Sequence, residues 1–463
     1  MIRKWQNRFS EIYASIRTDG SFVQNSLLMF SSSGASIAIQ FGFAFILSRI
    51  YSEGDYGIFQ VFNSYVAILG SIVTLNYNQA FVLPREERQF VALFQLTLKI
   101  SFFLCFLITL FSLVGGQWVL GLMHHEEVGA WIYLVGPTCL FVALDRIVMG
   151  MGVRQKAFKK ITIWSPVSTF ISKIFNVAYG SVNASPSGLI ITNILSFAIE
   201  TVLYIKYVTK DVWKTFKLKV TKSELREVAL EYKTFPLYIF PGNLINTVSN
   251  YLPPVMLATL GYGFDMVGFY GYALIILELP IRLMGSGVSS VFLPKATDIL
   301  ADRPHELGPA TWRVFKNMMF LSVGAVAFIY VVGEPLYSFC FSERWAPAGR
   351  LAEILTIYYF FRLVSTPLSI LFNVLRREKE FLAFQAGLLV IRVASLVVGS
   401  AYTSDFFELM EIFSIANAVA YFGMCVWIFA MVKIPMVKAI VFTLVCGIGI
   451  FASGWLLKAW IFG

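Results

Sequence analysis

The chain has 463 residues, of which 57% are hydrophobic and 14% are charged, and its formal net charge is +10. Because soluble domains average about 25% charged residues, this composition excludes a soluble globular domain and indicates an all-α membrane protein with many spans. The five cysteines are scattered without a CxxC pair, so neither a zinc site nor a disulfide framework is indicated, and no cofactor is expected.

Apolar runs of about 20 residues, the length that crosses a hydrocarbon core about 30 Å thick, recur along the chain. The first 23 residues are basic and amphipathic, and they predict a short helix on the inner interface, with Trp5 and Tyr13 as anchors and no cleavable signal peptide. The last apolar run either crosses once or turns back as a hairpin. We predict thirteen spans, at 24–49, 57–82, 91–114, 129–149, 161–180, 187–205, 235–260, 267–293, 317–333, 351–374, 381–400, 408–431 and 439–458.

The cationic residues sort onto one side of the predicted membrane. Of the 37 Lys and Arg, 27 lie in connectors on one side, and two, Arg344 and Arg350, lie in connectors on the other. Cationic loops are retained in the cytoplasm, so the N-terminus is predicted to be inside. This topology, with contact to anionic lipids, explains the net charge without a nucleic-acid partner. The inside connectors are 1–23, 83–90, 150–160, 206–234, 294–316, 375–380 and 432–438.

The two parts of the chain beside the longest inside connector, 206–234, share a pattern. A glycine opens the second span of each part and a Leu-Pro pair closes it, and Lys173 and Arg392 each precede a Gly-Ser pair by seven residues. Unless the match arises by chance, it predicts a parallel repeat of six spans, as in many transporters. The predicted parts are an N-terminal lobe at 1–208, a basic cytoplasmic connector at 209–234, a C-terminal lobe at 235–431 and an additional span at 432–463.

Eight cations lie in or beside the apolar runs, and four of them are deep. A cation at mid-membrane costs about 2.5–3.5 kcal/mol on insertion scales, so four that face lipid would cost on the order of 10–14 kcal/mol. We therefore expect the four to face a cavity, where they suit an anionic cargo such as a phosphate or an acidic sugar. Lys99 is shallower and either lines the cavity or reaches the inner surface by snorkelling. The deep cations are Lys173, Arg282, Arg362 and Arg392.

Glu278 precedes Arg282 by four residues, one helical turn. Two interpretations are open: a self-neutralising pair, or a coupling residue that takes up a proton or cation and releases Arg282 for substrate. The seventh span carries Asn243, Asn246 and Asn250 at positions i, i+3 and i+7. These amides serve either helix packing or a cavity lining. The same span should be kinked or broken by Pro236, Pro241, Gly242, Pro253 and Pro254.

Several motifs are missing from the sequence. No GxxxxGK[ST] loop is present, so ATP hydrolysis through that motif is not expected. The outside connectors reach only about 17 residues, which leaves little room for an external catalytic domain. His124 and His125 fall in an outside connector, where a surface pair is expected rather than a metal site.

The segment SRIYSEGDYG, from Ser48 to Gly57, resembles the "aRllspedyG" segment that follows the first helix of polysaccharide flippases. With the motifs below, the chain resembles Wzx-type O-antigen and exopolysaccharide flippases of the multidrug/oligosaccharidyl-lipid/polysaccharide (MOP) exporter superfamily, with spacing that agrees over roughly residues 20–300. The motifs that resemble the start of the second half of these flippases are Phe235-Pro236-Leu237-Tyr238, Pro253-Pro254-Val255, Gly268-Phe269-Tyr270, Leu279-Pro280 and Phe292-Leu293-Pro294.

The resemblance implies about 12–14 transmembrane helices in two six-helix lobes around a central cavity, in a bacterial inner membrane. It implies a flippase, not an enzyme, that moves undecaprenyl-diphosphate-linked oligosaccharides to the outer face by alternating access. The drive would be a gradient of H⁺ or Na⁺ or the membrane potential, and the partners would include membrane lipids and polysaccharide polymerase machinery. The alternatives are a multidrug exporter of the same superfamily and a membrane polymerase or ligase that acts on lipid-linked sugars.

The site prediction rests on depth and charge, and no residue is transferred from the family. Glu278 is the candidate coupling residue. The predicted cavity residues are Arg282, Lys173, Arg392, Arg362, Lys99, Asn243, Asn246 and Asn250.

Overall fold

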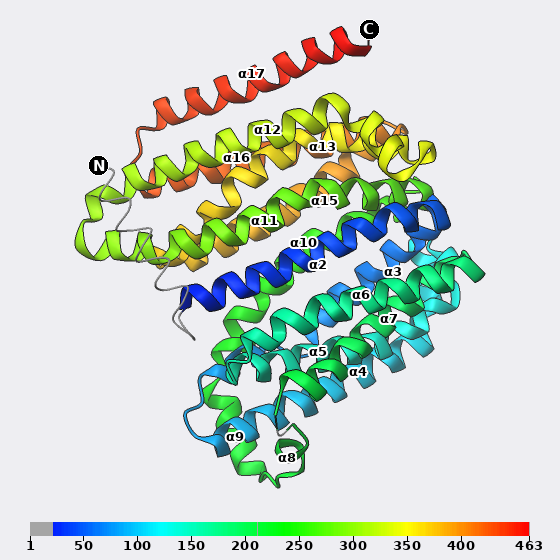
Figure 1. The fold of residues 1–463 in the computed structure, drawn as a ribbon, viewed down its shortest axis with the longest axis vertical. Coiled ribbons are helices and arrows are strands. Elements are labelled where there is room, and N and C mark those ends of the chain that lie inside the picture. The colour runs from blue at the N-terminus through cyan, green and yellow to red at the C-terminus, as the bar shows by residue number, and fades with distance from the viewer. Residues whose placement is uncertain (1–21, 211, 463) are drawn as a thin grey trace.

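The computed structural model describes residues 22–210 and 212–462, and the interfacial helix predicted for the first 23 residues lies almost wholly outside this part. Within the described part every regular element is helical, as predicted, and the long helices run alongside one another (Figure 1). Each predicted span overlaps one helix of at least 18 residues. These are α2 (Phe22–Ile50), α3 (Glu53–Ile72), α4 (Glu87–Met123), α5 (Val135–Arg154), α6 (Phe158–Val182), α7 (Pro186–Leu203), α10 (Phe240–Thr259), α11 (Phe264–Asp302), α12 (Leu307–Phe341), α13 (Ala346–Ser365), α15 (Glu378–Tyr402), α16 (Phe406–Met431) and α17 (Met436–Phe462). The spans 57–82 and 351–374 end in shorter elements, because α3 ends at Ile72 and α13 at Ser365.

Nine segments of the described chain are long and apolar enough to cross a membrane, judged by length and composition alone. The helices α3, α6, α10 and α17 fill predicted spans but are not among these nine. The first three have polar residues on one face, such as Gln60 on α3, Lys173 on α6 and Asn250 on α10. These faces line a central cavity, and their polar residues lower the mean hydropathy of the helices.

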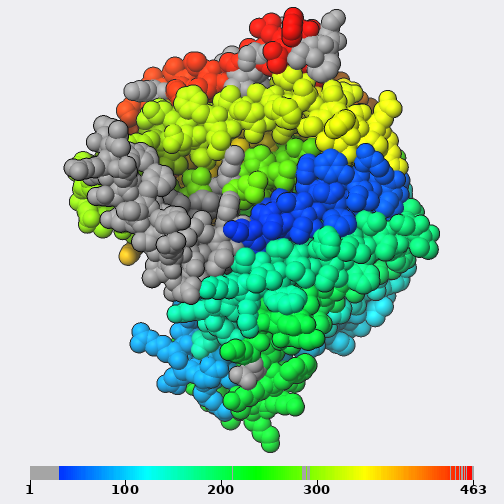
Figure 2. Space-filling view, in the orientation of Figure 1, coloured from blue at the N-terminus to red at the C-terminus, as the bar shows by residue number. Residues whose placement is uncertain are grey.

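The long helices form two sets with the same pattern of neighbours. In the first set α2 packs on α6, α4 on α5 and α6 on α7, and in the second set α10 packs on α15, α12 on α13 and α15 on α16. We name them the N lobe (Phe22–Leu203) and the C lobe (Phe240–Met431). The lobes contact each other mainly through α3, which packs on α10 and α11. Figure 2 shows the blue surface of α2 between the rest of the N lobe below and the green and yellow surface of the C lobe above. The lobe boundaries at 208, 234 and 431 stay a prediction.

The shorter elements lie at the ends of the long helices. The predicted basic connector contains α8 and α9, which both pack on α4. A capping box between Thr221 and Glu224 starts α9, and Arg88 of α4 pairs with Glu224 at 2.6 Å. The connector is therefore held against the N lobe. These elements are η1 (Tyr77–Val82), η2 (Glu126–Leu134), η3 (Tyr204–Val208), α8 (Val212–Lys217), α9 (Lys222–Glu231), η4 (Phe235–Ile239), η5 (Pro304–Glu306), η6 (Glu343–Trp345), η7 (Thr366–Ser369) and α14 (Ile370–Val374).

The seventh span is irregular only at its start. The turn η4, which contains Pro236, is π-helical, and α10 then continues as an α-helix through Pro253 and Pro254. Proline has no N–H to donate, so a wider turn accommodates it without a break in the helix. The predicted kink is therefore confined to the end of the span that is predicted to be cytoplasmic.

The last span, α17, is one continuous helix and not a hairpin, and it lies at the edge of the C lobe against α12 and α16 (Figure 1). The Lys458 ammonium donates to the carboxylate of Glu353 on α13. Glu353 is 6% exposed and also accepts from the backbone N–H of Glu334 at 2.9 Å. Lys458 therefore joins α17 to the C lobe.

We expect Lys458→Met to destabilise the protein by about 3 kcal/mol, because it leaves the buried Glu353 carboxylate without its cation. Thermal unfolding of the purified protein in detergent measures the change. The double variant Lys458→Met/Glu353→Gln should recover part of the loss. Arg303→Gln, which removes an exposed pair with Glu306, is the control and should change stability by less than about 1 kcal/mol. A Lys458→Met protein as stable as the parent would contradict this role.

Candidate functional site

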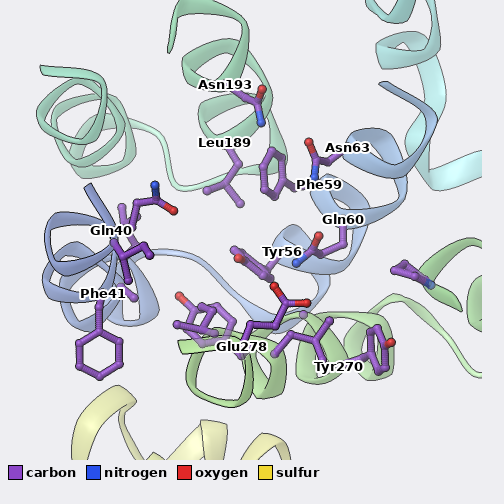
Figure 3. A pocket seen from close by; sticks show the side chains of 18 of the residues that line it. Gln40, Phe41, Tyr56, Phe59, Gln60, Asn63, Leu189, Asn193, Tyr270 and Glu278 are labelled. Atoms are coloured by element: carbon purple, nitrogen blue, oxygen red, sulfur yellow. The ribbon is translucent and has the colours of Figure 1, made fainter. Parts of the chain in front are cut away.

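A cavity of about 580 Å³ lies between the two lobes. The N lobe lines it with α2, α3, α6 and α7, and the C lobe lines it with α10, α11 and α13. Figure 3 shows Gln40, Gln60 and Asn193 from three N-lobe helices pointing into it, with Glu278 rising from α11. The volume falls in the range of small-molecule sites, about 300–1,000 Å³.

The structure brings five of the nine predicted site residues to this cavity. The lining contains three cations and one carboxylate, so it carries net positive charge. The predicted residues that line it are Lys173, Asn250, Glu278, Arg282 and Arg362. The predicted residues that do not line it are Lys99, Asn243, Asn246 and Arg392.

The charged groups on the C-lobe wall form a triad around Glu278. One carboxylate oxygen of Glu278 lies 2.6 Å from Nη2 of Arg282, and the other lies 3.7 Å from Nη1 of Arg362. The side chain of Arg282 is 53% exposed, whereas that of Arg362 is 16% exposed and packs over Tyr359, with its Cζ 5.2 Å from the ring centre. Arg362 is therefore a fixed cation at the base of the triad, and Arg282 is the cation that reaches into the cavity.

Arg392 is buried, 3% exposed, and bound by neutral groups of three other helices. Its Nε donates to Asn417 Oδ1 at 3.0 Å, its Nη2 to Tyr358 OH at 2.7 Å, and its Nη1 to Ser249 Oγ at 2.9 Å and Asn250 Oδ1 at 3.1 Å. Its hydrogen bonds join α10, α13, α15 and α16. The structure thus places Arg392 behind the cavity wall, where it holds Asn250 in position.

Three further predicted residues lie away from the cavity. Lys99 is exposed on the perimeter stripe of α4 that also exposes Phe102, Phe103 and Phe106, a position that fits snorkelling. Asn243 and Asn246 are exposed. The Asn246 side chain accepts from Asn250 Nδ2 at 3.1 Å, so part of the predicted asparagine face bonds to itself.

The N-lobe wall is lined by amides and hydroxyls that our prediction left out. Tyr56, Gln60 and Asn63 follow each other on α3 at i, i+4 and i+7, and Asn193 and Ser196 do so on α7 at i and i+3. Such polar stripes in apolar helices can be seen in the sequence, so they are a signal by which these lining residues could have been found. Lys173 is the one charged side chain that the described N-lobe residues add to the lining.

The sequence profile of the family described as "Polysaccharide biosynthesis protein" matches residues 46–350, more than half of the chain. The chain belongs to this family. Among curated proteins, no sequence matches it. The match supports the resemblance that the sequence motifs predicted, and the apolar helices of this family member are those of a multi-pass membrane protein.

Solved structures share its two-lobed fold. A multidrug resistance MATE family transporter of the MOP superfamily, in an inward-facing conformation, has a TM-score of 0.66 and 12% identity over 92% of this chain and 98% of that one. Lipid II flippase MurJ, in an inward closed conformation, has a TM-score of 0.65 and 13% identity over 93% and 98%. An outward-facing MATE family transporter has a TM-score of 0.53 and 15% identity over 89% and 96%. At these identities the similarity shows the fold alone.

The two lobes of this family member are closed against each other at the predicted outer ends of their helices. A Cβ on Gly57 would lie 1.8 Å from the carbonyl oxygen of Phe264, and one on Gly268 would lie 2.0 Å from that of Glu53. The first turns of α3 and α11 therefore meet backbone to backbone, and each glycine lies four residues after the carbonyl that the other glycine meets. We name this contact the glycine seam.

Arg344 and Trp345 of the C lobe bind the turn between α2 and α3 beside the glycine seam. Arg344 donates to the carbonyls of Ser48 and Tyr51, and Trp345 Nε1 donates to Ser48 at 2.9 Å. These contacts close the outer end of the cavity.

His125 also joins the lobes at the outer end, and the expectation of a surface pair is wrong for this residue. It is fully buried, whereas His124 is exposed. Its Nδ1 lies 2.6 Å from Tyr65 OH of the N lobe, and its Nε2 lies 3.2 Å from the Val255 carbonyl of the C lobe. A neutral imidazole fits both contacts, because Nε2–H donates to the carbonyl while Nδ1 accepts from the phenol.

We expect an acidic outer solution to open the outer end. Burial lowers the pKa of His125 below its usual 6.5, whereas the hydrogen bond to the Val255 carbonyl and the charge of Glu126 raise it by less, and His124 lowers it further. The closed state thus binds fewer protons than a state in which water reaches the imidazole. Closure is therefore most stable above pH 6.5 and weakens as the pH falls through that value. Spin-label distances between Val182→Cys and Tyr402→Cys, two exposed outer positions, should lengthen at pH 5.5. His125→Gln should abolish that change, and an unchanged pH response would contradict it.

Proposed function

We propose that this protein is a flippase for undecaprenyl-diphosphate-linked oligosaccharides, precursors of O-antigen or exopolysaccharide, in the bacterial inner membrane. The observation that carries the proposal is the lining of the inter-lobe cavity, with three cations and one carboxylate, in a member of the polysaccharide biosynthesis family. The cargo would enter from the cytoplasmic side, because the structure is closed at the predicted outer end. Its diphosphate and glycan would occupy the cavity while the polyprenyl tail stays in the lipid.

The C-lobe wall suits the diphosphate. Guanidinium groups bind phosphate oxygens through paired hydrogen bonds, which are about twice as strong as neutral ones. Arg282 is exposed in the cavity, and Arg362 lies on the other side of Glu278. The N-lobe wall suits the glycan, because Gln60, Asn63 and their amide neighbours both donate to and accept from sugar hydroxyls.

Glu278 would couple transport to an ion. In this structure its carboxylate forms ion pairs with both Arg282 and Arg362, so the cargo and Glu278 compete for the same cations. Uptake of a proton or Na⁺ at Glu278 would release Arg282 for the diphosphate, and loss of that ion would restore the pair and expel the cargo. The competition gives the differential interaction that alternating access needs.

Two other functions fit the fold less well. A multidrug exporter for cationic drugs needs carboxylates in its cavity, and among the described lining residues Glu278 is the one carboxylate, already paired with arginines. A polymerase or ligase acts on sugars at the outer face, where this structure is closed. A drug-susceptibility panel on a deletion strain separates the exporter from the flippase.

The test is the location of lipid-linked sugars in a strain that lacks this gene. Complete repeat units confined to the cytoplasmic face of the inner membrane are the expected result, because translocation would be the missing step. Complete but unpolymerised units on the outer face would overturn the proposal in favour of a polymerase or ligase. Units that are distributed as in the parent strain would exclude both.

A further inference from the structure

Lys173 lines the cavity from α6 without a hydrogen bond or an ion pair to any described residue. The other two cations of the lining share Glu278, which lies on the C-lobe wall. An unpaired ammonium group at mid-membrane is energetically costly, so we expect an anion to pair with it during part of the transport cycle. The anion that pairs with Lys173 is therefore part of the cargo or an ion that accompanies it.

The corresponding cation of the C lobe, Arg392, has partners among the described residues, unlike Lys173. Lys173 and Arg392 hold corresponding places, each seven residues before a Gly-Ser pair in the fifth span of its half. Arg392 is bound by Asn417, Tyr358 and Ser249, and it is buried and does not line the cavity. One half thus uses this cation to hold its own helices together, and the other half presents it to the cavity.

The surroundings of Lys173 are suited to a sugar. Asn176, one turn further along α6, is 6% exposed, lines the cavity and has a buried Oδ1 that accepts no hydrogen bond from the described residues. Asn193 of α7 has the same unpartnered oxygen, and Figure 3 shows its side chain pointing toward that of Asn63 on α3. Unpaired buried acceptors are costly, and hydroxyl donors of a ligand would satisfy them once the two amide groups turn toward the cavity. An anion bound at Lys173 should therefore carry hydroxyl groups beside it.

We propose that Lys173 binds the carboxylate of an acidic sugar within the glycan, so the cargo is an anionic oligosaccharide with a second negative group besides its diphosphate. The inference rests on the proposed flippase function and extends it from the lipid headgroup to the sugar. A diphosphate alone has no hydroxyl groups to donate to the asparagine oxygens beside Lys173. The arginine pair on the opposite lobe is already available to bind it. Lys173 is thereby a specificity residue for the charge of the glycan.

The test compares two cargoes in vesicles that contain the purified protein. Both are polyprenyl-diphosphate oligosaccharides of the same length, one wholly neutral and one with a single hexuronic acid. We expect Lys173→Met to slow transport of the acidic cargo about ten- to hundredfold, the effect of losing one charge-assisted hydrogen bond, and to change the neutral cargo less than twofold. Lys173→Arg should retain transport of both cargoes. Lys99→Met, which removes the perimeter lysine of α4, is the matched control and should change neither.

The outcomes separate this inference from the function on which it rests. An equal loss for both cargoes would overturn it, because Lys173 would then serve the diphosphate or the fold. Unchanged transport of the acidic cargo by Lys173→Met would overturn it as well. If the unaltered protein moves neither cargo, the proposed flippase function fails first, and the inference fails with it.

Discussion

Gly57→Ala should prevent the outer ends of the two lobes from closing and should stop transport. The Cβ that it adds would lie 1.8 Å from the carbonyl oxygen of Phe264, and helix backbones fix the positions of both atoms, so no rotamer change can separate them. Overpacking of this kind costs about 3 kcal/mol, and a penalty of that size in one state shifts a two-state equilibrium more than a hundredfold. The variant would therefore accumulate with its outer end open.

The spin-label pair Val182→Cys and Tyr402→Cys measures this change directly, in a background that lacks the native cysteines. We expect a longer distance in Gly57→Ala than in the parent and the same lengthening in Gly268→Ala, where the added atom meets the Glu53 carbonyl. The control is Gly42→Ala on α2, because nothing lies within 4 Å of its added Cβ. Equal distances in Gly57→Ala and Gly42→Ala would show that the glycine seam tolerates a methyl group.

The arrangement of spans could be predicted because it depends on length and charge, which are properties of the sequence alone. Each apolar run overlaps one long helix, although α3 and α13 end before their predicted spans do. The helix ends could not be predicted, because hydropathy marks where the lipid ends and not where the helix ends. Helix α4 continues to Met123, nine residues past its predicted span, and the connector that follows holds the buried His125. That burial depends on α10, which is distant in sequence.

The depth of the site residues in the membrane could be predicted, but not the direction in which each one faces around its helix. The cost of a charge in lipid placed Lys173, Arg282 and Arg362 in the protein interior, and all three line the cavity. The same argument applied equally to Arg392, which satisfies it by bonding to neutral groups behind the wall. The direction that a side chain faces around its helix is decided by packing between distant spans, and one sequence does not contain that information.

Arg282→Ala should abolish transport while the protein remains in the membrane in normal amounts. Arg282 is the exposed member of the triad, so its loss removes the guanidinium that can meet the diphosphate without breaking the buried contacts of Arg362. Each charge-assisted hydrogen bond to phosphate contributes about 1.5–3 kcal/mol, and a guanidinium makes two. The expected loss of cargo affinity is therefore at least about a hundredfold. Transport assays in vesicles and binding of the lipid-linked cargo to the purified protein both measure it.

Two further variants test whether the Arg282 contact depends on its charge alone or also on its paired hydrogen bonds. Arg282→Lys keeps the charge but not the paired geometry, so it should recover only part of the activity. Arg303→Gln, which lies at the end of the same helix in an exposed pair with Glu306, should transport normally. Full transport by Arg282→Ala would remove this residue from the mechanism and leave Arg362 as the cation for the diphosphate. In that case Glu278 would compete with the cargo for one arginine and not two. Ion uptake at Glu278 would then release Arg362, and not Arg282, for the cargo.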